Sequence, residues 1–221
     1  MDIVVNALYW DSIDSRIVNS HIKVMETFNI PIKYNCTNMR HGLWMDIIME
    51  NVSADIYVFF DIDCVPISKD AYYEAINYVK RKKTFIGNAQ VSNHIEPKKH
   101  IFAAPSFFAI SRECYDYLNK PSFLETHRSD VAEELSYVAD EKGIEYKCLY
   151  PTKFDRISQT DGVWNLSNYG CYGIGTVFEN KFYHLFQSRL SSNVDLFEKR
   201  CNEIIFGNFN THSMYDSKNF I

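Results

Sequence analysis

Two aspartates separated by a single residue follow directly after an apolar run in this chain. The stretch reads IYVFFDIDCVP, so Asp61 and Asp63 come immediately after the residues Ile56–Phe60. Because side chains alternate sides along an extended chain, we expect both carboxylates to point the same way. Paired carboxylates form a strong site for a hard divalent cation, Mg²⁺ or Mn²⁺, which keeps open positions for phosphate oxygens. The alternative is a turn that carries two surface aspartates.

The elements before this pair predict an α/β fold. Strands and helices alternate, with strands expected at Ile3–Leu8, Ile32–Cys36 and Ile56–Phe60, and helices at 12–28 and Leu43–Asn51. Ser12 is expected to cap the first helix. The Ile56–Phe60 strand is apolar on both faces, as is typical of the middle of a covered sheet. Ligands of open α/β sheets bind beyond the carboxyl ends of the strands, which is where Asp61 and Asp63 are expected.

The rest of the chain continues this alternation and becomes more polar. We expect helices at 69–80, 111–118, 129–142 and 194–206, and strands at 84–87, 101–110, 146–150 and 181–186. Ser129 or Asp130 is expected to cap the third of these helices, and residues 87–100 are expected to form a polar loop. Because the sequence shows no internal repeat and no clear linker, we predict one α/β domain over residues 1–206 with a mixed central sheet flanked by helices. Residues 207–221 are expected to form a C-terminal tail.

Composition narrows the class of protein. The 221 residues are 46% hydrophobic and 15% aromatic, which suffices for a substantial core, and the net charge of -5 does not favour a general nucleic-acid binder. No apolar run is long enough to cross a bilayer and the N-terminus shows no basic leader, so we expect no membrane partner and a cytoplasmic location. Six cysteines are spread singly without a CxxC pair, which favours free thiols over a zinc ribbon or a disulfide scaffold.

The motif YVFFDID at residues 57–63 resembles the DxD motif of the GT-A glycosyltransferases, and the resemblance extends over most of the chain. It implies a single Rossmann-like GT-A domain that moves a sugar from a nucleoside-diphosphate sugar to an acceptor hydroxyl. It also implies that Mn²⁺ or Mg²⁺ bridges the motif and the donor diphosphate. Asp63 would bind the metal directly, and Asp61 would hold the ribose or a metal-bound water. The acceptor stays open between a glycan, a small molecule, a protein and a modified nucleobase.

The same resemblance assigns roles near the C-terminus and on the acidic helix. GT-A enzymes often take a third metal ligand from a late histidine, and His184 stands at that place, although a buried core histidine is the alternative. The helix that ends at Gly143 resembles the acidic helix of inverting GT-A enzymes, so Asp130 or Glu133 would deprotonate the acceptor hydroxyl. The family's usual Glu-Asp pair falls on residues 131–132, and acidic residues at a helix N-terminus also complement its dipole.

Donor-binding residues are also implied by the resemblance. Tyr9, at the end of the first strand, would stack on the nucleotide base, and His41 would approach the ribose or phosphate. The stretch GNAQVSNH at residues 87–94 is rich in hydrogen-bonding side chains, so we expect Gln90 to contact the sugar. Arg189 would neutralise the diphosphate, because a guanidinium pairs well with phosphate oxygens. The donor sugar, its base and the stereochemistry stay open.

Haloacid dehalogenase phosphatases offer a second interpretation, because FFDIDCV at residues 59–65 also resembles their strand–DxD motif. In that case Asp61 would be the nucleophile and Asp63 the acid/base. The motif here lies behind about sixty residues of α/β structure, whereas in that family it opens the fold. Asp155 and Asp161 stand apart and do not form the acidic pair that would complete a magnesium site. A third interpretation is a non-catalytic nucleotide-sugar-binding domain.

Overall fold

The central element of the protein is a mixed six-stranded sheet. The computed structural model describes residues 1–92 and 100–219, and its sheet has the order β2-β1-β3-β6-β5-β7. The strands are β1 (Ile3–Tyr9), β2 (Lys33–Cys36), β3 (Ile56–Asp61), β5 (Phe85–Val91), β6 (Ile101–Ser111) and β7 (Lys147–Leu149). β1 pairs with β2 and β3 in parallel and β5 with β7 in parallel, while β6 is antiparallel to β3 and β5. The predicted fold class, a mixed central sheet flanked by helices, is confirmed.

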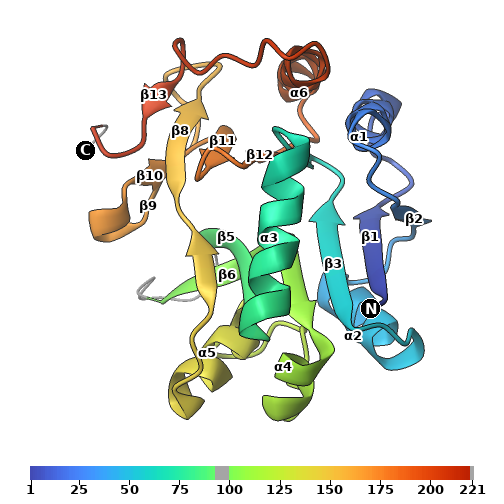
Figure 1. Cartoon of the computed structure of the whole chain (residues 1–221). Helices are drawn as coiled ribbons and strands as arrows, with labels where there is room; N and C mark the ends of the chain where they lie inside the picture. Colours follow the sequence, from blue (N-terminus) through green and yellow to red (C-terminus); the bar gives the residue numbers. More distant parts are fainter. Residues whose placement is uncertain (93–99, 220–221) are drawn as a thin grey trace.

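Helices cover both faces of this sheet (Figure 1). They are α1 (Ser15–Thr27), α2 (His41–Asn51), α3 (Lys69–Lys82), α4 (Arg112–Tyr117), α5 (Glu133–Lys142) and α6 (Ser191–Ile205), with a 3₁₀ turn at Ser167–Tyr169. In β3, Val58 and Phe60 pack into a core with α3, whereas Tyr57 and Phe59 pack into a core with α2, α4 and α5. The two-sided apolar pattern of β3 therefore has its expected cause, which is burial on both faces.

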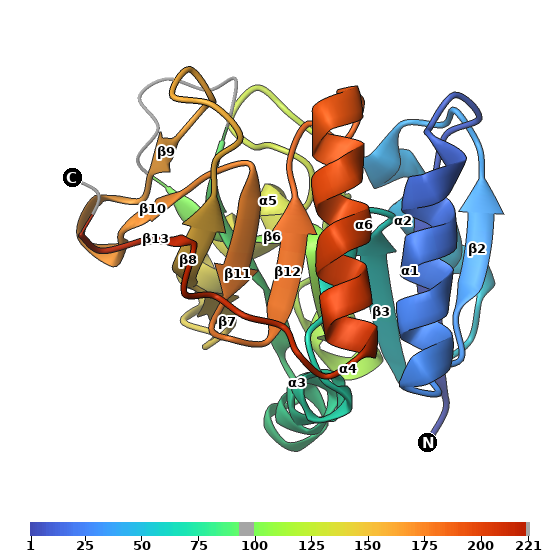
Figure 2. The same ribbon diagram turned by 90° about the horizontal axis from the view of Figure 1, so that it is seen from above.

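A second, antiparallel sheet begins where β3 ends. Its order is β13-β8-β11-β12-β4, and β9 (Trp164–Asn165) pairs with β10 (Cys171–Tyr172) in a separate two-stranded ladder. Its strands are β4 (Cys64–Pro66), β8 (Pro151–Asp155), β11 (Gly175–Phe178), β12 (Phe182–Leu185) and β13 (Tyr215–Asp216). α6 packs against this sheet and runs beside α1 (Figure 2), where Arg16 donates a 2.6 Å hydrogen bond to Asp195.

Several predicted boundaries differ from the structure for local reasons. α1 is capped by Asp14, not Ser12, because the Asp14 carboxylate accepts the Arg16 N–H at 2.8 Å. β5 continues to Val91, so the predicted loop at 87–100 is wrong over residues 87–91; residues 93–99 lie outside the described residues. The segment from residue 207, expected as a tail, contributes β13, which pairs with β8.

The start of α5 also differs from the prediction. The helix begins at Glu133, and Ala132 before it adopts a left-handed conformation with φ of 66°. Neither Ser129 nor Asp130 is the residue that directly precedes the helix. The predicted stop at Gly143 is confirmed, since this glycine has φ of 66° and its N–H bonds to the end of the helix.

The cysteines and the helices can be compared with what the composition predicts. All six cysteines are free thiols, as predicted. Among the helices of residues 1–92 and 100–219, none combines the length and apolar character that a bilayer crossing requires.

Candidate functional site

Three potential metal ligands converge where the two sheets meet. Ligand atoms of Asp61, Asp63 and His184 all lie within 4.8 Å of one another. The Nε2 atom of His184 is 3.4 Å from Oδ1 of Asp63 and 3.9 Å from Oδ2 of Asp61. Two carboxylates and one imidazole form a donor set that can hold a divalent cation, so the residues present fit the metal that the sequence implied.

The backbone explains why these three side chains meet. Asp61 is the last residue of β3, and a tight turn at residues 62–63 carries the chain from the central sheet into β4 of the second sheet. His184 on β12 stands opposite Cys64 of β4, and the N–H of Leu185 donates to the carbonyl of Asp63 at 2.9 Å. A turn, and not the extended chain that we expected, brings the two carboxylates together.

The site concentrates negative charge in a partly buried place. Burial raises the pKa of Asp61, and the neighbouring Asp63 charge raises it further, while His41 and His184 act in the opposite direction. Asp63 and His184 are only 8% and 5% exposed. The Nδ1 atom of His184 is buried without a hydrogen-bond partner among the described residues, and the Nε2 atom is the one that lies near the two carboxylates. A bound cation would offset the repulsion between the two carboxylates.

A cavity of about 980 Å³ opens onto the two aspartates. It lies at the carboxyl ends of β1, β2 and β3, which is the usual position of ligand sites in open α/β sheets. Its lining comprises Leu8, Trp10, Ser12, Ile13, Asp14, Thr37, Asn38, Met39, His41, Asp61, Ile62, Asp63, Ser188, Arg189, Ser191 and Val194. The volume is in the range of small-molecule and cofactor sites.

Among the residues predicted to bind the donor, Arg189 and His41 line this cavity and Tyr9 does not. The guanidinium of Arg189 lies 5.1 Å from the centre of the Trp10 ring, in a cation–π contact. Tyr9 instead packs into the core beneath α1 and α6. His41, the first residue of α2, has its Nδ1 3.5 Å from Oδ1 of Asp61. The aromatic ring at the cavity is therefore Trp10, which directly follows β1 and is one residue beyond the predicted Tyr9.

Gln90 is placed differently from our expectation. It belongs to β5, is 9% exposed and pairs with Phe102 of β6, and it is not among the described residues that line the cavity. The predicted sugar-binding loop at 87–94 is a strand over its first five residues, while Asn93 and His94 lie outside the described residues. In this segment the buried Asn88 donates a hydrogen bond across the sheet to Ser106 Oγ at 3.0 Å.

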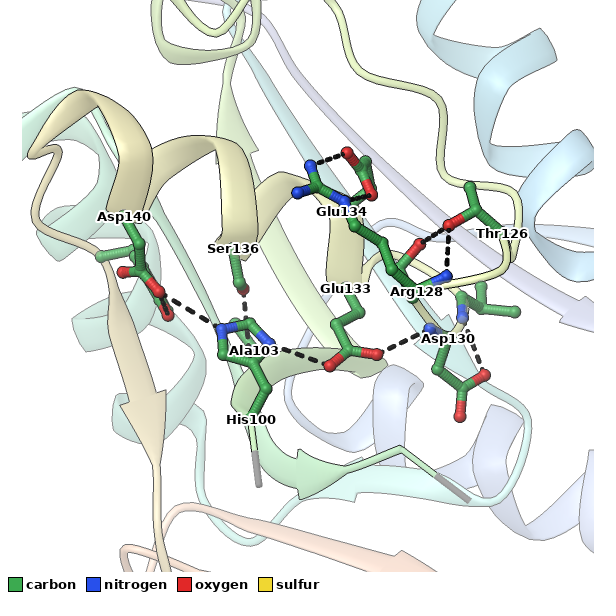
Figure 3. A network of polar contacts seen from close by, with 12 residues as sticks. His100, Ala103, Thr126, Arg128, Asp130, Glu133, Glu134, Ser136 and Asp140 are labelled. Atoms are coloured by element: carbon green, nitrogen blue, oxygen red, sulfur yellow. Dashed lines mark hydrogen bonds and ion pairs between the residues drawn. The ribbon is translucent and has the colours of Figure 1, made fainter. Parts of the chain in front are cut away.

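The two candidate bases have different surroundings. Glu133 is 1% exposed, and both of its carboxylate oxygens accept short hydrogen bonds, from the Asp130 N–H at 2.6 Å and from His100 Nδ1 at 2.8 Å (Figure 3). This burial does not favour Glu133 as a base, since it could not reach an acceptor. Asp130 is half-buried, its Oδ1 accepts the Val131 N–H at 2.8 Å, and its carboxylate lies on the side away from His100 (Figure 3).

Comparisons with known proteins found similar solved structures but no matching family. No protein-family model and no curated protein matches the sequence. Among similar solved structures, A197 from STIV is 12% identical, with 84% of this chain and 94% of that chain covered and a TM-score of 0.46. The catalytic domain of Drosophila beta1,4-galactosyltransferase 7, in complex with xylobiose, is 11% identical over 66% of this chain and 63% of that chain, with a TM-score of 0.47.

A further similar structure is the mannosyltransferase PcManGT from Pyrobaculum calidifontis in complex with GDP-Man and Mn²⁺. It is 9% identical, with 66% of this chain and 54% of that chain covered and a TM-score of 0.47. The match thus spans less than two thirds of each of these two glycosyltransferase chains. Similarity at this level assigns no activity to the chain.

Proposed function

We propose that the protein is a metal-dependent glycosyltransferase that moves a sugar from a nucleoside-diphosphate sugar to an acceptor hydroxyl. The observation that carries this proposal is the convergence of Asp61, Asp63 and His184 within 4.8 Å, where the two aspartates line a cavity of about 980 Å³. A cavity of this size accommodates a nucleotide-sized ligand.

The metal-binding residues would be Asp63, Asp61 and His184, with Mn²⁺ or Mg²⁺ as the ion. When bound, the ion would act as a Lewis acid that neutralises the negative charge of the departing diphosphate. The chain itself contributes the placement of its donor atoms, which is set by the β4–β12 pairing and by the turn after β3. His41 lies near one carboxylate oxygen of Asp61 and His184 near the other, at 3.5 and 3.9 Å.

Donor binding is supported by the contact of Trp10 with Arg189. The indole offers an aromatic face for a nucleobase, and the exposed guanidinium supplies the positive charge that a diphosphate requires. Both residues line the cavity that also holds Asp61 and Asp63, so base, diphosphate and metal subsites share one space.

We assign the acceptor base to Asp130. Its charge is one cause, after burial, of the raised pKa of Tyr172, whose ring centre is 5.2 Å from that of Phe186. Phe186 in turn lies 4.2 Å from the ring of His184, so aromatic contacts connect Tyr172 with a metal ligand, while Asp130 itself is not among the described residues that line the cavity. In the reaction Asp130 would accept the hydroxyl proton, the acceptor oxygen would bond to the anomeric carbon, and the bond from that carbon to the diphosphate oxygen would break.

The phosphatase interpretation receives less support. Such an enzyme needs further acidic ligands beside the nucleophile, and within the described residues the cluster around Asp61 contains only Asp63 and His184. A domain that binds the nucleotide-sugar without catalysis has the same cavity, so only an activity measurement separates it from an enzyme.

The experiment is a screen of nucleoside-diphosphate sugars with Mn²⁺ or Mg²⁺, in which release of free nucleoside diphosphate is measured. We expect the wild type to release nucleoside diphosphate from one class of donor. In Asp61→Asn and Asp63→Asn the rate of this release should fall by at least about 100-fold. Asp116→Asn, which removes an exposed carboxylate that pairs with Lys120, is the matched control and should retain activity. Orthophosphate release from phosphate esters would instead support the phosphatase, and tight metal-dependent binding without any release would support the non-catalytic domain.

A further inference from the structure

His100 is held between two carboxylates of one helix. Its Nδ1 lies 2.8 Å from Oε1 of Glu133 and its Nε2 lies 3.2 Å from Oδ2 of Asp140 (Figure 3). A neutral imidazole has only one N–H, so it would leave one carboxylate facing a lone pair. The geometry therefore matches the protonated ring, which donates on both sides.

The surroundings of His100 favour the same protonation state. Burial lowers the pKa of His100, but its hydrogen bonds to Glu133 and Asp140 outweigh this effect, so the pKa is raised above its ordinary value of 6.5. The ring also stacks on Tyr137 at 3.9 Å between centres. Arg128 contacts the same tyrosine, but its charge is engaged by Glu134 and Glu141.

Glu133 connects this histidine to Asp130. Its second oxygen, Oε2, accepts the backbone N–H of Asp130 at 2.6 Å, while its own N–H donates to the carbonyl of Asp130 at 3.0 Å. Glu133 thus fixes the peptide groups on both sides of the Asp130 Cα. The Asp130 carboxylate takes no part in these two bonds.

We propose that His100 and Glu133 are positioning residues for Asp130, with the protonated His100 fixing Glu133 and Glu133 fixing the backbone that orients the Asp130 carboxylate. This proposal rests on the proposed function for the role of Asp130, but the coupling itself is a property of the folded chain. When His100 loses its proton, one of its two carboxylate contacts is lost and the hold on Glu133 weakens. A misplacement of the base by about 1 Å costs on the order of 100-fold in rate, so a small loosening is sufficient to affect turnover.

The test follows the pH titration of the wild-type protein by NMR, using the ring nitrogens of His100 and the backbone amide of Asp130. We expect the Asp130 amide to shift with the same midpoint as the His100 ring, and that midpoint to lie above pH 6.5. The pH transition of the Asp130 amide should disappear in His100→Gln and persist in Glu141→Gln. Glu141 is on the same helix as Glu133 and Asp140, and its replacement removes only an ion pair with Arg128. An Asp130 amide that does not respond while His100 titrates, or a His100 midpoint below 6.5, would overturn the proposal.

Kinetics supply the second measurement. The donor is the nucleotide-sugar that the screen described under the proposed function identifies. With it, kcat should fall about tenfold or more as pH rises through the His100 midpoint, while the KM for the donor stays constant. Asp140→Asn should move this decline to lower pH and retain the fold, because it removes the more exposed of the two carboxylates. A decline at the same pH in His100→Gln would contradict the proposal. Absence of activity in the wild type would contradict the proposed function, while the amide titration would still decide the coupling.

Discussion

The Nε2 atom of His184 lies 3.4 Å from Oδ1 of Asp63, across the pairing of β12 with β4. The two residues are far apart in the sequence, and the second sheet brings them together at the end of β3. This placement gives the aspartate pair a nitrogen donor that is only 5% exposed.

We expect His184→Asn to weaken Mn²⁺ binding without unfolding the protein. A ligand that binds only the native state at 100 times its Kd stabilises it by about 2.7 kcal/mol, and a 100-fold weaker site retains only about 0.4 kcal/mol. The measurement is the increase in free energy of unfolding on addition of Mn²⁺. His212→Asn changes an exposed histidine and should leave the increase intact; an unchanged increase in His184→Asn would argue against this ligand.

Asp61→Asn should leave the metal-free protein as stable as the wild type, or more stable by up to about 1 kcal/mol. Residues that serve a functional site often lower the stability of the fold, so that replacing them can stabilise the protein. The physical reason is the repulsion between Asp61 and Asp63 in a partly buried site, where burial also raises the pKa of Asp61. The same variant should lose the stabilisation by Mn²⁺. Urea denaturation with and without the ion measures both effects, and a clear loss of stability without metal would show that Asp61 has a structural role.

Arg200→Ala should destabilise the fold by about 3–5 kcal/mol, because it leaves the buried Asp155 carboxylate without its cationic partner. Arg200 is 2% exposed and donates to both oxygens of Asp155, at 3.0 and 2.7 Å. Lys120→Ala removes an exposed pair with Asp116 and should cost less than about 1 kcal/mol. The measurement is equilibrium unfolding. Equal losses of the free energy of unfolding in the two variants would contradict the expectation that the buried ion pair matters more than the exposed one.

Acidification should destabilise the protein through His21. Burial lowers the pKa of this fully buried histidine from 6.5 to about 3, so between these values the proton binds only to the unfolded chain. This contribution to stability is present above pH 6.5 and is lost as pH falls, by about 2 kcal/mol between pH 6.5 and 4.5. His21→Gln should reduce this loss and His212→Gln should not, which unfolding measurements at several pH values can check.

The core of the fold was predictable because its signals are local. Continuous apolar runs in β1 and β3 and helical spacing in α1 and α3 depend on burial, and burial constrains every residue of such a segment. The strands β9 and β10 were missed because they contain two residues each, too few for any periodic pattern. β5 was shortened because Asn88 is polar, although in the structure it is buried and bonded to Ser106.

The candidate site was predictable only in part. Asp61 and Asp63 were identified because a buried strand ends at them, and His184 because the resemblance to GT-A enzymes implies a late histidine ligand. Trp10 was missed because its role depends on a contact with Arg189, which follows β12 and has no local signal. Likewise, the hydrogen bonds that engage Glu133 come from His100, directly before β6, and from the Asp130 backbone, and sequence spacing does not reveal that these two lie together.

The central claim is that Asp61, Asp63 and His184 bind one divalent cation at the diphosphate of a nucleotide. The most direct measurement is a crystal structure of the protein with Mn²⁺ and a nucleoside diphosphate, in which anomalous scattering locates the ion. We predict one strong manganese peak within coordination distance of all three side chains, with diphosphate oxygens on its open positions. A peak elsewhere, or a nucleotide bound in the cavity with no ion between the aspartates and the diphosphate, would contradict the claim.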